Sequence, residues 1–261
     1  MPHAVVNDQR IYFEDTGGDG PAVVLAHGFL MDHEMFAPQV AALREAYRVI
    51  TWDERGFGQT QHDGQPFDYW DSAADCLGLL DHLGIERAVV GGMSQGGFIS
   101  LRVALTAPTR VRGLILLDTE AGVPDPDRLV AEEGMVDLWI SVGPVDDLAN
   151  AVAGLIIDDP EENPKWIAKW RAAPKEAMLQ PSKCLHGRDD ITARLGEITC
   201  PALVVHGTRD TAIEMEKAEV LAAGLVGSGG VVKVDGSHAV SLTNPEPVNA
   251  AIIDFLADLP T

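Results

Sequence analysis

The stretch Gly91-Gly92-Met93-Ser94-Gln95-Gly96-Gly97 places one serine hydroxyl between two pairs of glycines. An apolar run at 87–90 precedes it and predicts a strand, and the segment 98–107 that follows has apolar residues at helical spacing. A chain that turns at once from strand to helix needs unusual backbone angles, and glycines two positions before and after the serine allow the two elements to approach closely. The pattern predicts that Ser94 projects its hydroxyl from the carboxyl edge of a sheet.

Short, wholly apolar runs recur along the chain and predict strands of a sheet that is buried on both faces. Alternating residues near the N-terminus predict an antiparallel hairpin around Asn7-Asp8. The predicted strands span 22–26, 47–51, 87–91, 113–117, 202–206 and 231–234, and the predicted helices span 35–46, 70–83, 95–107, 214–225 and 245–259. Strands that alternate with helices predict an α/β fold, with a mainly parallel sheet and helices on both faces.

The alternation of strands and helices stops between about Gly122 and Gly196. This segment is rich in proline and acidic pairs and holds three of the five tryptophans, Trp139, Trp166 and Trp170. It predicts short helices inserted after the strand that ends at Leu117.

The composition limits the partners and the compartment. The formal net charge is −21, from 40 acidic and 19 basic residues, which argues against binding to nucleic acid or to an anionic membrane surface. Three cysteines are too few for a disulfide framework and have no metal-type spacing. We find no signal-peptide pattern and no apolar run long enough to span a bilayer, so we expect a cytoplasmic protein.

A serine hydroxyl at neutral pH needs a base to become nucleophilic, and histidine is the usual one. His238 follows the last predicted strand through Asp235-Gly236-Ser237 and precedes the last helix, at the same edge of the sheet as Ser94. The other histidines have less suitable positions. His27 and His206 end apolar strands, where packing or a backbone hydrogen bond is expected, and the rest lie in the first strand or in polar surroundings: His3, His33, His62, His82 and His186.

The imidazole needs an acceptor on its second nitrogen, and two carboxylates follow strands at this edge. Asp210 follows the run ALVVHGTR, and Asp118 follows GLILL. We favour Asp210, because the chain order Ser94, Asp210, His238 matches the order nucleophile, acid, base of folds that carry such a serine turn. We keep Asp118 as the alternative. Two backbone amides are candidates to bind a developing oxyanion: that of Gln95 at the helix start and that of Phe29 in the loop after the first parallel strand.

Several motifs in order make the chain resemble the α/β-hydrolase superfamily over essentially its whole length. They are His27-Gly28-Phe29, the stretch Asp53–Thr60, the serine elbow, HGTRD at 206–210 and the late His238. With the tail at 237–256, the first two motifs resemble the branch of 3-oxoadipate enol-lactonases, small carboxylesterases and cofactor-free haloperoxidases. This resemblance implies an eight-stranded sheet with one antiparallel strand. The core would comprise residues 1–121 and 197–261, with a helical lid at 122–196.

The resemblance also implies a Ser-His-Asp triad of Ser94, Asp210 and His238 that cleaves a carboxylic ester or lactone through an acyl-enzyme. It implies no metal and no organic cofactor. We expect a small-molecule substrate in a pocket between lid and sheet. A homo-oligomer is compatible with the sequence. The expected pocket residues are Phe29, Leu30, Met93, Trp139 and Leu242. Carbon–carbon bond hydrolysis and perhydrolase or haloperoxidase-like chemistry on the same triad remain alternatives, and a non-catalytic ligand receptor is a remote one.

Overall fold

A computed structural model describes residues 3–60 and 63–259. His62, one of the histidines set aside above, lies outside the described residues. The sheet has eight strands in the order β1-β2-β4-β3-β5-β6-β7-β8. Their bounds are β1 His3–Val6, β2 Gln9–Asp15, β3 Ala22–Ala26, β4 Arg48–Trp52, β5 Ala88–Met93, β6 Val111–Leu117, β7 Pro201–Gly207 and β8 Gly227–Val234. The fold is therefore the predicted mostly parallel α/β sheet.

One strand, β2, runs antiparallel to the rest of the sheet, as the resemblance implies. β2 pairs antiparallel with both β1 and β4, and every strand pair from β4 to β8 is parallel. The hairpin forms as predicted, because Asn7 and Asp8 adopt positive φ values of 47° and 62°, which suit a tight turn between two strands.

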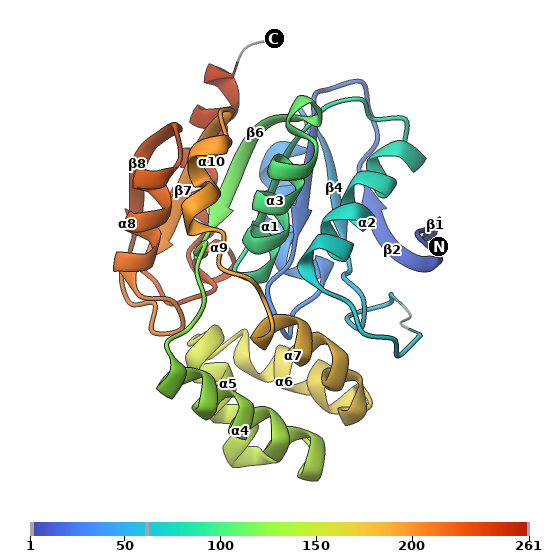
Figure 1. The fold of residues 1–261 in the computed structure, drawn as a ribbon, viewed down its shortest axis with the longest axis vertical. Coiled ribbons are helices and arrows are strands. Elements are labelled where there is room, and N and C mark those ends of the chain that lie inside the picture. The colour runs from blue at the N-terminus through green and yellow to red at the C-terminus, as the bar shows by residue number, and fades with distance from the viewer. Residues whose placement is uncertain (1–2, 61–62, 260–261) are drawn as a thin grey trace.

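Both faces of the central strands are buried, and successive residues serve opposite faces. In β3, Val23 and Leu25 belong to one hydrophobic cluster, and Val24 and Ala26 belong to the other. The first cluster is completed by α1 (Ala37–Leu43) and α10 (Pro245–Asp258), and the second by α2 (Tyr69–His82), α3 (Gln95–Thr106) and α8 (Met215–Gly224). Figure 1 shows these helices layered on the sheet.

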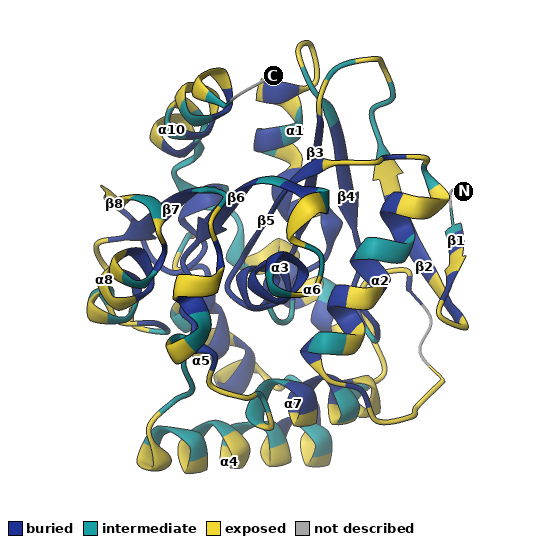
Figure 2. Ribbon diagram, turned by 45° about the horizontal axis from the view of Figure 1, so that its top comes forward, coloured by how far each residue is buried: buried dark blue, intermediate teal, exposed yellow. Residues whose placement is uncertain are grey.

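A helical insertion, residues 122–196, lies beyond the end of the sheet at which β6 finishes (Figure 1). Its α-helices are α4 (Pro126–Val142), α5 (Asp146–Ile156), α6 (Asn163–Ala172) and α7 (Leu179–His186). The helix α4 spans 17 residues and continues through Gly134, so this part of the insertion is longer than the short helices predicted. Figure 2 shows that much of α4 is exposed, and Trp139 is its buried exception.

The three cysteines are unpaired thiols. Burial raises the pKa of Cys76 to about 12 and raises the pKa values of Cys184 and Cys200 as well. Within residues 3–60 and 63–259, no helix has both the length and the apolarity needed to cross a bilayer.

Candidate active site

Ser94 occupies a strained turn between β5 and α3. Its backbone has φ 52° and ψ −113°, in the left-handed region that non-glycine residues rarely adopt. Glycine is required on both sides, because a Cβ on Gly92 would lie 2.4 Å from the carbonyl oxygen of Ala26, and one on Gly96 would clash with the same atom even more closely. The hydroxyl of Thr119 donates to the carbonyl of Ser94 at 2.7 Å, which ties the turn to the end of β6.

His238 and Asp210 form a direct hydrogen bond, although 28 residues separate them. Nδ1 of His238 lies 2.7 Å from Oδ2 of Asp210. The other carboxylate oxygen of Asp210 accepts hydrogen bonds from the backbone amides of Ala212 and Ile213, at 2.8 and 2.9 Å. An ionised carboxylate can only accept, so the imidazole carries its proton on Nδ1 and leaves Nε2 as the basic nitrogen.

Burial alone would raise the pKa of Asp210, but the nearby imidazole of His238, the hydrogen bond to it and the backbone donors outweigh burial, and the pKa is lowered. Asp118 is in the opposite situation. Burial and the charge of Asp210 raise the pKa of Asp118 well above its usual range, and one of its oxygens accepts from the amide of Gly207 at 2.7 Å. The structure thus brings Asp210, rather than Asp118, into contact with His238.

His27 and His206 hold backbone groups, as their positions after apolar strands indicate. In His27, Nε2 accepts from the amide of Glu54 at 3.0 Å, so Nδ1 is the donor to the carbonyl of Gly28 at 2.8 Å. His206 binds the carbonyl of Ile213 through Nε2 at 2.8 Å. Burial lowers the pKa of both imidazoles, in keeping with neutral structural side chains.

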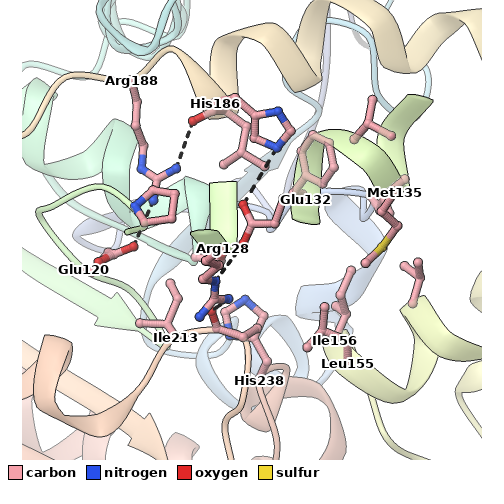
Figure 3. A pocket seen from close by; sticks show the side chains of 18 of the residues that line it. Glu120, Arg128, Glu132, Met135, Leu155, Ile156, His186, Arg188, Ile213 and His238 are labelled. Atoms are coloured by element: carbon pink, nitrogen blue, oxygen red, sulfur yellow. Dashed lines mark hydrogen bonds and ion pairs between the residues drawn. The ribbon is translucent and has the colours of Figure 1, made fainter. Parts of the chain in front are cut away.

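Ser94 and His238 line the same cavity, which opens between the insertion and the carboxyl end of the sheet and has a volume of about 150 Å³. Figure 3 shows His238 at one wall of this cavity, facing side chains of the insertion. Phe29 lines the cavity as well, and Gln95 is the first residue of α3, directly after Ser94. Over the described residues, neither the Phe29 amide nor the Gln95 amide donates to another backbone group.

Two of the four other expected pocket residues, Leu30 and Trp139, line this cavity. Met93 and Leu242 are not among the described residues that do. Met93 is fully buried in β5, where its sulfur lies beneath Gly28, and Leu242 packs against the core. Gln95 turns its side chain inward and accepts a hydrogen bond from the hydroxyl of Tyr69 at 3.3 Å.

A set of charged residues in the cavity wall was not anticipated from the sequence. It comprises Glu120, Arg128, Glu132, His186, Arg188 and Lys217, which we call the charged wall. Its members come from the loop after β6, from α4, from the end of α7 and the loop that follows it, and from α8. His186, assigned above to polar surroundings, has a side chain that is only 10% exposed, and burial lowers its pKa. No local pattern signals this set, because only the fold assembles it.

Two groups of side chains bring possible metal-ligand atoms within 4.8 Å of one another: Asp32, His33 and Asp53, and Asp118, His206 and Asp210. In the first group, His33 Nδ1 is 2.7 Å from Asp53, and in the second, both oxygens of Asp210 already accept from neighbours. A metal in either group would have to replace these hydrogen bonds, so neither is organised as an open coordination site.

Comparison with known proteins agrees with this architecture. The family model described as the alpha/beta hydrolase fold matches residues 21–245, and the chain belongs to that family. The chain is similar to 3-oxoadipate enol-lactonase 2 of Acinetobacter baylyi, with 26% identity over 90% of this chain and 88% of the relative. The resemblance deduced from the motifs is therefore confirmed, and the protein is a hydrolase of this family.

Two solved structures cover almost the whole chain. A thermophilic esterase from Thermogutta terrifontis superimposes with a TM-score of 0.90 and 29% identity, covering 100% of this chain and 99% of the esterase. The enol-lactonase from Burkholderia xenovorans gives a TM-score of 0.89 and 27% identity, covering 98% of this chain and 100% of the lactonase.

Proposed function

We propose that the protein hydrolyses a carboxylic ester or lactone through an acyl-enzyme on Ser94. The observation that carries the proposal is the 2.7 Å contact between His238 and Asp210 at the wall of the cavity that Ser94 also lines. A hydroxyl, an imidazole with a free Nε2 and a buried carboxylate are the parts that acyl transfer needs.

The proposed reaction has two halves. Oγ of Ser94 attacks the substrate carbonyl while Nε2 of His238 takes the hydroxyl proton, and the Asp210 carboxylate stabilises the resulting imidazolium. The amides of Phe29 and Gln95 hold the oxyanion. His238 then protonates the departing alkoxide, and in the second half it activates the water that releases the acid and restores Ser94.

We further propose that the helical insertion serves as a lid over the site, with residues 1–121 and 197–261 as the catalytic core. In support of this division, the cavity has walls from both parts. Trp139 and Ile156 belong to the insertion, whereas Phe29 and Ser94 belong to the core. The expected substrate is a small molecule that enters between the two.

The test is a panel of esters and lactones assayed on the wild type and on Ser94→Ala. We expect the variant to lose activity by at least about 1000-fold, because no other group supplies the nucleophile. Ser141→Ala, at an exposed position of α4, is the matched control and should retain wild-type rates. Full activity of Ser94→Ala would end the proposal.

Parallel assays with a vinylogous diketone and with peracid formation distinguish the alternatives on the same triad. Turnover of the diketone in preference to every ester would favour carbon–carbon hydrolysis. Binding without turnover of any substrate by the wild type would favour a receptor.

A further inference from the structure

The cavity has an apolar part and a charged part. Figure 3 shows Met135, Leu155 and Ile156 on one side of the Arg128–Glu132 pair, and Glu120 and Arg188 on the other. The apolar part suits a hydrocarbon portion of a substrate. A polar group on the rest of the substrate would then lie against the charged wall.

The two arginines of the charged wall already have acceptors. Arg188 donates to Oε1 of Glu120 at 2.9 Å and to the carbonyls of Gly122 and Leu185 at 3.2 and 2.9 Å, and its guanidinium lies 4.6 Å from the centre of the Phe98 ring. Arg128 donates to Glu132 at 2.8 Å and to the carbonyl of Ala212. Neither arginine is held open for a substrate carboxylate.

Glu120 is different, because half of its hydrogen-bonding capacity is unused. The residue is 5% exposed and lines the cavity, and over the described residues its Oε2 atom has no hydrogen-bond donor. Nζ of Lys217 is 3.8 Å from Oε2, too far for a hydrogen bond, and the Lys217 side chain is 43% exposed. A buried carboxylate oxygen without a donor is costly, so this position favours a group that brings one.

The sign of the local charge points the same way. Four acidic residues line the cavity, Glu120, Asp125, Glu132 and Glu214, against three basic ones, Arg128, Arg188 and Lys217. Burial lowers the pKa of His186, so it adds no charge near neutral pH. A carboxylate group on the substrate would therefore meet an excess of negative charge in the cavity.

We infer that Glu120 is a specificity-determining residue that accepts a hydrogen bond from a hydroxyl or ammonium group of the substrate. The substrate is then an ester or lactone with an apolar portion and a hydrogen-bond donor, and its donor occupies the space through which Lys217 now approaches Oε2. The inference rests on the proposed function, since it names the substrate class of that same site. Glu120 lies close to Ser94 along the fold, because the hydroxyl of the preceding residue, Thr119, donates a hydrogen bond to the backbone carbonyl of Ser94.

The experiment compares matched esters that end in a hydroxyl, an ammonium, a methyl or a carboxylate group. Each group is placed in the acyl part in one series and in the alcohol part in another. We expect kcat/KM of the wild type to be about tenfold or more higher for a donor-bearing ester than for its methyl counterpart. In Glu120→Gln, whose amide turns the free acceptor into a donor, this preference should fall to about twofold or less. Glu219→Gln removes one carboxylate outside the cavity wall and should keep the full preference.

Lys217→Met keeps the test decisive if Glu120→Gln does not fold. Loss of the lysine removes a competitor for Oε2, so the preference for a donor should persist or increase. Preference of the wild type for the carboxylate ester, abolished in Lys217→Met, would overturn the inference. Equal hydrolysis of donor-bearing and methyl esters would overturn it too while leaving the proposed function intact. Hydrolysis of no ester at all would instead remove the proposed function on which it rests.

Discussion

At the scale of single residues, the buried acidic side chains fall into two groups, those with a lowered pKa and those with a raised pKa. Asp210 and Asp53 have lowered pKa values, because their interactions with the imidazoles of His238 and His33 outweigh the effect of burial, which would raise the pKa. Glu54 has no such compensation. It is 2% exposed, and its one side-chain donor among residues 3–60 and 63–259 is the hydroxyl of Ser72 at 2.6 Å. Burial raises its pKa to about 8. A neutral Glu54 therefore suits the folded protein better than a charged one.

We predict that Glu54 lowers the free energy of unfolding as the pH rises. Its folded-state pKa of about 8 exceeds the usual value of 4.5, so between these values the folded state holds a proton that the unfolded state has lost. The free energy of unfolding should fall through this window by up to about 1.4 kcal/mol per pH unit from this group. Glu54→Gln should remove that part of the slope, and urea unfolding of both proteins at several pH values measures it. Parallel profiles for the two proteins would contradict the prediction.

Which site residues could be found from the sequence depends on how local their signals are. Ser94 is marked by its glycines, and His238 and Asp210 by their places after strands that end at one edge of the sheet. Glu120 and Arg188 are 68 residues apart and have no signal of their own. Their pairing needs the path of the whole insertion, which local patterns do not specify.

At the scale of elements, the insertion is held to the core by hydrogen bonds to the very loops that build the site. The indole of Trp170 in α6 donates to the carbonyl of Leu30 at 2.6 Å, next to Phe29. The carbonyl of Ile157, just after α5, accepts from the hydroxyl of Ser237 at 2.6 Å, next to His238. The position of the insertion and the geometry of the loops that carry Phe29 and His238 are thus coupled.

We predict that Trp170→Phe weakens this coupling. The Leu30 carbonyl loses its donor, which should cost about 1–3 kcal/mol of unfolding free energy, and kcat should fall more than KM rises because the neighbouring Phe29 amide is less well held. Trp166→Phe, on the same helix, makes the same ring change at a residue with no hydrogen bond to this loop. Equal effects of the two substitutions on kcat would show that ring volume, rather than the hydrogen bond, matters.

The spacing of apolar residues predicted most core strands and helices to within a few residues. It was less accurate at two elements that contain glycine, β8 and α4. β8 begins at Gly227 and runs through Gly229 and Gly230, residues that on their own indicate a break. Pairing with β7 keeps this segment extended in spite of its composition. In α4, likewise, one glycine inside a helix was compatible with either one long helix or two short ones.

At the scale of the whole molecule, the dominant property is the net charge of −21. Many acidic side chains are paired, as in Arg48–Asp15 and Arg55–Asp75, but the excess of carboxylates leaves a repulsive field over the surface. We predict that the free energy of unfolding near neutral pH rises when sodium chloride is increased from about 0.05 to about 0.5 M, because salt screens this repulsion. Urea titrations at each salt concentration test this, and a fall in stability would show that screened ion pairs outweigh the repulsion.

The state of the three native thiols makes the chain convenient for reporter chemistry. Only the thiolate reacts readily with maleimides, and burial keeps Cys76, Cys184 and Cys200 protonated at neutral pH. A cysteine introduced at an exposed position of α4, such as Asp137, would be alkylated far faster than any of them. A fluorophore attached there, in the otherwise native background, would test whether the insertion moves during turnover.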